Sequence, residues 1–302
     1  MATPSTPIKT PNIGIADLSE APRIAGRSRF VRSFVRNKIA LVGLLIIIPM
    51  CLGAIFADYI APYDPIEPHY TDLKVPPSWD YPLGTDELGR DIFSRLLYGA
   101  RISLVIGFVA QGVSVSIGIV LGLLSGWYGG WVDDLIMRFT EIVWAIPGLM
   151  FLIVVITITE PSAIMIFLAL GFIAWPGQAR LMRSQVLSIK EMDYVTSAQA
   201  LGASTARIMF YHILPNAIAP MIVVATLGVA GAILTESTLS FLGLGVKIPN
   251  PSWGTMVNTG RNYFTDAWWY AVFPGLTIML TVLGFNFIGD GLRDALDPHT
   301  TD

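Results

Sequence analysis

The 302-residue chain is rich in hydrophobic residues (53%), poor in charged ones (14%) and nearly neutral, with a net charge of −3. Soluble domains carry about 25% charged residues, so this composition excludes a soluble enzyme, a nucleic-acid-binding protein and a disordered chain. The single cysteine, Cys51, excludes a disulfide framework and a cysteine-ligated metal site. The composition predicts an integral membrane protein.

Six stretches of at least 18 residues contain no charged side chain. A helix that crosses a hydrocarbon layer of ~30 Å needs about 20 apolar residues, and the short alternating segments of a β-barrel are not seen. We therefore expect an all-α membrane protein with six transmembrane helices, at 39–57, 102–132, 142–159, 161–179, 208–235 and 267–289.

The predicted organisation follows from these stretches. Lys and Arg are more frequent in the segments that lie inside if the N-terminus is cytoplasmic, so we expect both termini in the cytoplasm. The first apolar run follows a long polar leader, and no cleavable signal is expected. The predicted segments are a partly disordered, basic cytoplasmic stretch (1–38), the first transmembrane helix (39–57), an extracytoplasmic segment (58–101), a core of five helices (102–290) with a cytoplasmic loop (190–215), and a cytoplasmic tail (291–302).

Small residues and prolines mark several predicted helices. Gly118, Gly122 and Gly126 place a small residue at every fourth position, which predicts close packing against another helix. Pro147 follows the start of the third predicted span and Pro176 ends the fourth, and both predict kinks.

Two polar residues belong to these spans. Glu236 lies at a span end, where we expect it at the membrane interface. Gln111 lies within a span, where we expect a hydrogen bond between helices rather than a contact with substrate.

The segment 58–101 is too long for a simple turn, and six prolines keep it irregular. Gly84 and Gly89 allow tight turns, and Thr85 or Asp86 can cap a helix that runs into the second span.

Charged residues in this segment are four apart, Arg90 after Asp86 and Arg95 after Asp91, and could pair on one helix face. One interpretation is a solvated, self-paired interface helix. The other is a docking surface for an extracytoplasmic partner, made by Asp86, Arg90, Asp91 and Arg95.

The loop between spans four and five predicts two short helices. The first covers 193–202 and ends at a glycine, and Ser204 or Thr205 caps the next, which runs toward Pro215. Apolar residues recur every three or four positions, at Ala198, Leu201, Thr205, Ile208 and Met209. Such a segment can insert into a groove on a soluble partner, or it can fold back onto the bundle.

Several motifs are missing from the sequence. It has no Gly-x-x-x-x-Gly-Lys phosphate loop and no His-Glu-x-x-His motif, and no span carries a row of ionisable residues. We therefore expect no enzyme activity, no catalytic residue and no metal site. Energy for uphill transport would enter from another subunit.

The sequence resembles the permease subunits of ABC importers for oligopeptides and dipeptides, in particular the C-type subunit of the permease pair. The segments that carry the resemblance are 83–91 (LGTDELGRD), 239–245 (LSFLGLG), 251–254 (PSWG) and 289–298 (GDGLRDALDP). The cytoplasmic loop is similar to the "EAA" loop of that family. Ala198, Gly202, Leu214 and Pro215 match its pattern, whereas Thr196, Ser197 and His212 depart from it.

The resemblance implies a type I ABC-importer-like permease in a prokaryotic inner membrane, with cytoplasmic coupling helices and a long first extracytoplasmic loop. It implies as partners a second homologous permease, two cytoplasmic ATPases that bind ATP and Mg, and an extracytoplasmic binding protein. The chain itself would need no cofactor. The residues expected to couple to the ATPases are Thr196, Ser197, Ala198, Leu201, Gly202, Ala203, Arg207 and Pro215.

The resemblance favours peptides as the substrate. A related importer for nickel chelates or oligosaccharides is the alternative. A stand-alone secondary transporter and a membrane-embedded enzyme are two further alternatives. The lack of charged residues within the spans disfavours the first of these, and the lack of catalytic motifs disfavours the second.

Overall fold

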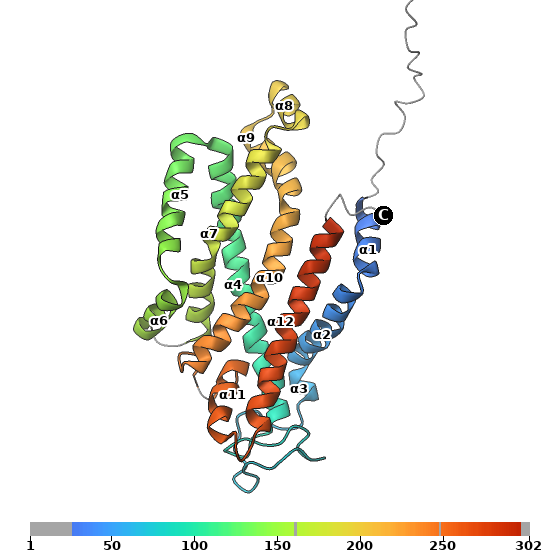
Figure 1. Ribbon diagram of the computed structural model, residues 1–302, viewed down its shortest axis with the longest axis vertical. Helices are drawn as coiled ribbons and strands as arrows, with labels where there is room; N and C mark the ends of the chain where they lie inside the picture. The colour runs from blue at the N-terminus through green and yellow to red at the C-terminus, as the bar shows by residue number, and fades with distance from the viewer. Residues whose placement is uncertain (1–25, 160–161, 248, 297–302) are drawn as a thin grey trace, which may run out of the picture.

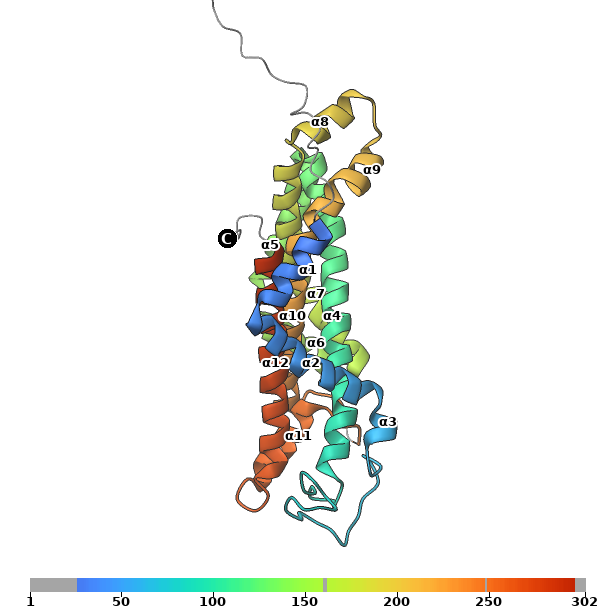
Figure 2. The same ribbon diagram turned by 90° about the vertical axis from the view of Figure 1, so that its right-hand side faces the viewer.

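The computed structural model describes residues 26–159, 162–247 and 249–296, and the regular structure in this part of the chain is helical. Figures 1 and 2 show an elongated bundle whose long helices run mostly along its length. The helices are α1 (Gly26–Arg36), α2 (Lys38–Ile55), α3 (Ala57–Ile60), α4 (Ile92–Tyr128), α5 (Gly130–Ala145), α6 (Gly148–Thr159), α7 (Ala163–Ile189), α8 (Asp193–Ala200), α9 (Thr205–Arg207), α10 (Leu214–Phe241), α11 (Trp253–Gly260) and α12 (Trp269–Leu296), with a π-helix at Ile208–Ile213 and a 3-10 turn at Arg261–Tyr263.

Five helical units of the described chain are long and apolar enough to cross a membrane. They are α2, α4, α7, α12 and the continuous unit Thr205–Phe241 that α9, the π-helix and α10 form together. The sequence predicted six spans. Helices α5 and α6 supply a sixth only if the two, bent by 80° at their junction, count as one broken span.

The break between α5 and α6 lies at Pro147. Ile146 is extended (φ −86°, ψ 124°), because a residue that precedes proline is disfavoured in the helical region. The sequence predicted a kink here, but the bend is far sharper, and α5 begins at Gly130, well before the predicted span.

Pro176 behaves differently, and the prediction that it ends the fourth span is wrong. It lies inside α7, which continues to Ile189. Trp175 and Pro176 are both buried, and α7 packs along α4. Contacts with a neighbouring helix allow a membrane helix to tolerate the loss of the backbone hydrogen bond that proline cannot make.

The glycines of α4 pack directly against α7, as predicted. A Cβ at Gly118 would lie 2.3 Å from Gln178 Cβ, one at Gly122 2.4 Å from the Ala179 carbonyl oxygen, and one at Gly126 2.7 Å from Val186 Cβ. The missing side chains therefore set the separation of the two helices.

The two ends of the bundle differ. Helices α8 and α9 extend beyond one end, which we call the α8 end, whereas residues 61–91, α3 and α11 form the opposite α11 end (Figure 1). Each end has its own apolar core. Met182, Val186 and Ile213 belong to the core at the α8 end, and Trp253 and Trp269 to that at the α11 end.

Helix α1 was not predicted, since residues 1–38 were expected to be a partly disordered basic segment. Phe30 and Phe34 stack within it, and α1 packs on α12. Asn37 then caps α2, accepting hydrogen bonds from two backbone N–H groups, and donates to Asp294 Oδ2 at 2.9 Å. Residues 1–25 and the second half of the predicted tail (297–302) lie outside the described residues.

Helix α11 packs tightly on α10, and a Cβ at Gly254 would lie 2.6 Å from Ser240 Cβ. Glu236, which the sequence placed at a span end, lies near the end of α10. Its side chain is fully buried in the described chain, where it accepts a hydrogen bond from Ser240 Oγ at 2.7 Å.

Candidate functional site

The turn between α8 and α9 projects furthest from the α8 end. Gly202 has a positive φ (+79°), which only glycine adopts without strain. Ala203 N–H donates to the Ala198 carbonyl and Gly202 N–H to the Gln199 carbonyl, so a Schellman motif ends α8 as predicted. Ser204 Oγ accepts from Arg207 N–H at 3.4 Å and caps α9.

A few apolar side chains fix this turn to the bundle. Val195 of α8, with Ile208 and Ile213 of the π-helix, is buried among side chains of α7 and α10. A π-helix accommodates one extra residue per turn, which here places Ile208, Met209 and Ile213 on the buried side. The segment therefore has a rigid inner face and an outer face that contacts nothing in the described chain.

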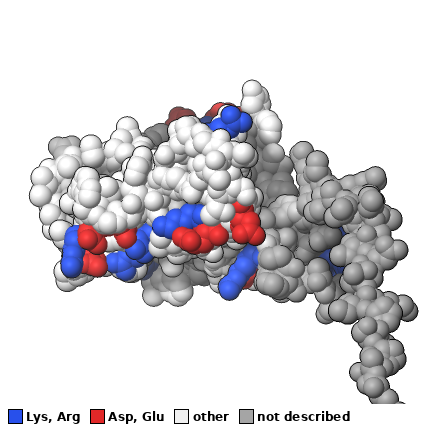
Figure 3. All heavy atoms as spheres, turned by 90° about the horizontal axis from the view of Figure 1, so that it is seen from above, with Lys and Arg blue, Asp and Glu red and all other residues white. Residues whose placement is uncertain are grey.

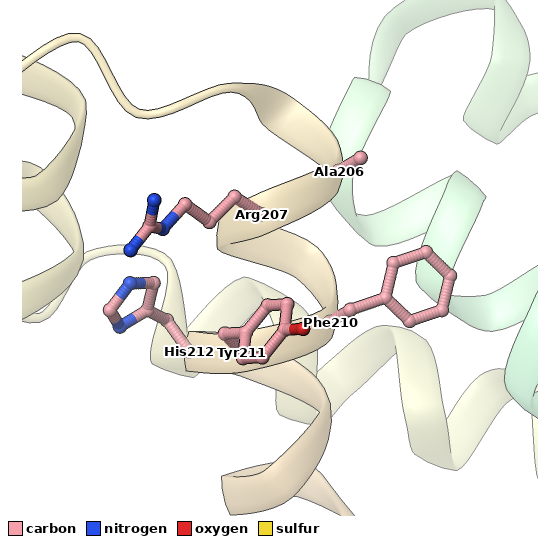
Figure 4. Close-up of a pocket in the computed structure, with 5 residues that line it drawn as sticks. All are labelled: Ala206, Arg207, Phe210, Tyr211 and His212. Atoms are coloured by element: carbon pink, nitrogen blue, oxygen red, sulfur yellow. The ribbon is translucent and has the colours of Figure 1, made fainter.

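The outer face is unusually apolar. Leu201 is 87% exposed, Tyr211 76% and Phe210 59%. A hollow of about 950 Å³ adjoins this face and is lined by Ala206, Arg207, Phe210, Tyr211 and His212. In Figure 4, Arg207 and His212 point to one side of the helix and Phe210 to the other.

The structure gathers the predicted coupling residues into one projection. Of the eight, Ala198 and Ala203 are partly buried and the other six are exposed. The apolar stripe predicted through this loop does not form one face. Ile208 and Met209 point inward, whereas Leu201 and Thr205 face outward.

Ion pairing ties together the helices beneath this projection. Arg183 Nε donates to Asp133 Oδ1 at 2.6 Å, Ser125 Oγ donates to the same oxygen, and Lys190 Nζ donates to the Gly126 carbonyl at 3.3 Å. These bonds join the ends of α4, α5 and α7. Viewed onto this end, Figure 3 shows charged side chains of both signs along the margin of a mostly uncharged surface.

A buried polar network organises the α11 end. Asp86 accepts from the backbone N–H groups of Leu88 and Arg90, pairs with Arg90 Nε at 2.7 Å, and lies 3.4 Å from Arg95 Nε. Arg95 also donates to the Pro65 carbonyl at 2.6 Å. Gly84 and Gly89 have positive φ, as predicted, and form the turns around the network.

The structure corrects the predictions for the four charged residues of this network. Asp86 and Arg90 pair, as their spacing predicted. Helix α4 begins at Ile92 with Asp91 as its cap, so Asp86 precedes the helix, and Arg95 pairs with Asp86 rather than with Asp91. Asp86, Arg90, Asp91 and Arg95 are at most 4% exposed, which excludes both a solvated helix face and direct contact of these side chains with a partner. The buried network stabilises the conformation of residues 61–91.

Burial and pairing shift three pKa values at this end. Burial raises the pKa of Asp91, although its hydrogen bonds from Ser94 oppose the shift. The hydrogen bond from Arg101 lowers the pKa of Asp58. Desolvation and the hydrogen bond to Asp72 raise the pKa of Tyr81 to about 12. The shifts of Asp58 and Asp91 report contacts of residues 58–91 with α4, and that of Tyr81 reports a contact within this segment.

Sequence reasoning missed two features. Trp269 Nε1 donates to the Thr85 carbonyl at 3.2 Å and joins α12 to the polar network. No local pattern predicts this contact between residues far apart in the chain. Phe210 and Tyr211 were also not singled out, although adjacent exposed aromatic residues are a signal for a partner surface.

The fold and its projecting helical turn define a class of protein, an all-helical, multi-pass membrane component of a transport system. A family model described as "Binding-protein-dependent transport system inner membrane component" matches residues 118–302, and one described as the N-terminal TM domain of oligopeptide transport permease C matches residues 27–77. The chain belongs to the family of binding-protein-dependent transport system inner membrane components, as the sequence predicted, and the family places it in the bacterial inner membrane.

Curated relatives agree over nearly the whole chain. It is 48% identical to the dipeptide transport system permease protein DppC of Escherichia coli K12 over 275 residues (89% of this chain, 92% of that protein). It is 45% identical to the oligopeptide transport system permease protein OppC of Bacillus subtilis 168 over 265 residues (88% and 87%). A chain from an inward-facing structure of the MetNI methionine ABC transporter has the same fold, with a TM-score of 0.52 and 18% identity over 67% of this chain and 97% of that one.

Proposed function

We propose that the chain is a permease subunit of an ATP-driven importer of dipeptides or oligopeptides and forms half of the translocation path. Two relatives, named as dipeptide and oligopeptide transport permeases, support the substrate class, because the chain is 45–48% identical to them over most of both chains. The partner set proposed with it is a second permease, two ATPases that hold ATP and Mg, and an extracytoplasmic binding protein.

The projection at 190–215 is proposed as the contact with the ATPases. The observation that carries this assignment is its two-sided construction, with Val195, Ile208 and Ile213 buried in the bundle and Leu201 and Tyr211 uncovered. Exposed large apolar side chains on a segment outside the bilayer predict a protein partner. A firmly anchored inner face lets a push on the outer face move α7 and α10.

The orientation follows from the same assignment. With the α8 end in the cytoplasm, α1 and both termini lie inside, and residues 61–91 face outward, where their exposed surface meets the binding protein. The buried charges at Asp86, Arg90, Asp91 and Arg95 would then act indirectly, by holding that surface in shape.

The Gly202→Asp variant tests the coupling role. An L-residue in the left-handed region costs about 1–2 kcal/mol, and the added charge lies on the proposed docking face. We expect peptide uptake in cells to fall roughly ten-fold or more, the equivalent of about 1.4 kcal/mol of coupling or greater, with normal membrane insertion and less co-purified ATPase.

Gly130→Asp is the matched control, because Gly130 also has a positive φ (+51°) and open space around it but is the first residue of α5. Normal uptake and normal ATPase co-purification with Gly202→Asp would refute the docking assignment. Ion-gradient-driven flux through the purified chain alone would instead show a secondary transporter.

A further inference from the structure

A second hollow, of about 520 Å³, lies at mid-height of the bundle where α4, α10 and α12 meet. Helix α10 packs on both α4 and α12 along this stretch (Figure 1). Apolar side chains, including Phe108 and Phe285, form most of its lining. Its polar groups are Gln111 and Ser116 of α4 and Thr226 of α10, and none of the described lining residues is charged.

Gln111 is only 5% exposed, yet its side-chain Nε2 has no hydrogen-bond partner among the described residues. Its carboxamide lies against the backbone of α10 at Gly228, where a Cβ would approach Oε1 to 2.3 Å and Nε2 to 2.6 Å. An unpaired buried donor costs about 1–3 kcal/mol. The sequence predicted a hydrogen bond between helices here, and for Nε2 that prediction is wrong.

The two hydroxyl groups in the hollow are available as hydrogen-bond acceptors rather than as donors. Ser116 Oγ donates to the Gly112 carbonyl at 2.7 Å, and Thr226 Oγ1 donates to the Ile222 carbonyl at 2.9 Å. Each hydroxyl proton is used within its own helix, so each oxygen is left as an acceptor. The hollow thus presents two acceptors in an apolar, uncharged setting, and an unpaired donor lies buried in its wall.

We propose that this hollow binds the main chain of a peptide during its passage, with the Gln111 side chain turning from Gly228 into the hollow so that Nε2 donates to a peptide carbonyl. The inference rests on the proposed function. A peptide unit carries an acceptor and a donor and so complements both kinds of group. Lipid tails carry neither, and headgroups lie about 15 Å from mid-membrane. A helix of the second permease has already bonded its main-chain carbonyls internally.

This chemistry predicts how the site discriminates. Contacts to the main chain are the same for every peptide sequence, and the apolar walls accept varied side chains. Because the described lining has no charge, the site recognises neither terminus by ion pairing. The volume is within the roughly 300–1,000 Å³ range of small-molecule sites.

The first test measures uptake by the complete transporter carrying Gln111→Leu, which keeps the size of the side chain and removes the donor. The extracytoplasmic binding protein sets the half-saturating concentration of alanyl-alanine, so we expect that value to stay and the maximal rate to fall roughly ten-fold, equivalent to about 1.4 kcal/mol. Thr226→Val should lower the rate in the same way. Thr157→Val is the matched control, since Thr157 makes the same bond to its own helix but lies on α6.

Three outcomes would overturn the site. The first is a wild-type maximal rate with Gln111→Leu, and the second is a change confined to the half-saturating concentration. The third is loss of the second permease on purification of this variant, which would make Gln111 an assembly residue. If the wild-type complex itself takes up no peptide, the proposed function fails rather than this inference.

A second measurement does not depend on the stability of Gln111→Leu. In a Cys51→Ala background, Ser116→Cys is labelled with N-ethylmaleimide in the full complex. Peptide with ATP and binding protein should slow the labelling. An Ile158→Cys variant, at a position that is 78% exposed on α6, should react at an unchanged rate. Equal labelling of the Ser116→Cys variant with and without peptide contradicts the proposal.

Discussion

At the scale of single residues, charge in this protein is used mainly inside the chain. Asp86 pairs with Arg90 and Arg95 in a site where all three side chains are almost inaccessible. The sequence spacing suggested pairs along a helix, but the helix begins after Asp91. The Asp86–Arg90 pair forms at its four-residue interval although both residues precede the helix, whereas Arg95 pairs with Asp86 rather than with Asp91.

Asp86→Asn removes the carboxylate that contacts two buried guanidinium groups, of which Arg90 keeps a second partner in Glu87. Removing one partner of a buried pair costs about 3–5 kcal/mol, so we expect a clearly lower melting temperature of the purified protein in detergent. Asp80→Asn, at an exposed position of the same segment, is the control and should leave the melting temperature unchanged. Equal melting of both variants would show that the network contributes nothing to stability.

The Asp58–Arg101 pair gives the α11 end a pH dependence. The pKa of Asp58 is lowered in the folded chain, chiefly by the hydrogen bond from Arg101, and Tyr98 also donates to this carboxylate. A depressed carboxyl pKa stabilises the fold above the unfolded value, near pH 3.9. That stability is lost as pH falls through the folded pKa.

In an acid titration followed by tryptophan fluorescence, Asp58→Asn should remove this contribution, so that its unfolding curve differs from that of the wild type at neutral pH and meets it at the acid end. Curves that differ equally at every pH would mean that Asp58 acts by something other than its charge.

At the scale of helices, small residues and prolines decided how elements pack. The glycine stripe of α4 could be predicted from its spacing, and α7 occupies it. The effects of Pro147 and Pro176 could not, because the same residue broke one helix and was accommodated in another. Contacts with neighbouring helices determine whether a proline breaks a helix or is accommodated in it, and the local sequence does not specify those contacts.

Gly122→Val tests the α4–α7 contact. Its Cβ would lie 2.4 Å from the Ala179 carbonyl oxygen, a backbone atom that cannot rotate away. Overpacking typically costs about 1–3 kcal/mol, so we expect lower yields of folded protein and a lower melting temperature. Gly177→Ala is the control, because a Cβ there meets no atom within 4 Å, and it should be neutral or slightly stabilising. Normal melting with Gly122→Val would show that the two helices can separate freely.

At the scale of the whole molecule, the two ends of the bundle present different kinds of surface. The α8 end presents an anchored projection with uncovered apolar side chains, and the α11 end presents an irregular segment stiffened by buried ion pairs. Peptide import would need one contact inside the cell and another outside, with a path between them.

Cysteine labelling tests the proposed orientation. In a Cys51→Ala background, a Trp79→Cys variant, at a position that is 100% exposed, should react with a membrane-impermeant maleimide added to intact spheroplasts. A Leu201→Cys variant, at the other end, should react only after the membrane is opened. The reverse pattern would invert the orientation and remove the coupling role of the α8 end.

The sequence alone determined the membrane class, the long apolar helices, the glycine contact and the helix–turn–helix of the loop, because each depends on local composition, spacing or a single backbone conformation. It also carried the family resemblance. Tertiary structure alone decided which side chains of that loop face outward, that the charges near Asp86 are buried, and that Gln111 keeps an unpaired donor beside a hollow. Those properties depend on which distant segments come together, and burial and pairing are set by neighbours in space rather than in sequence.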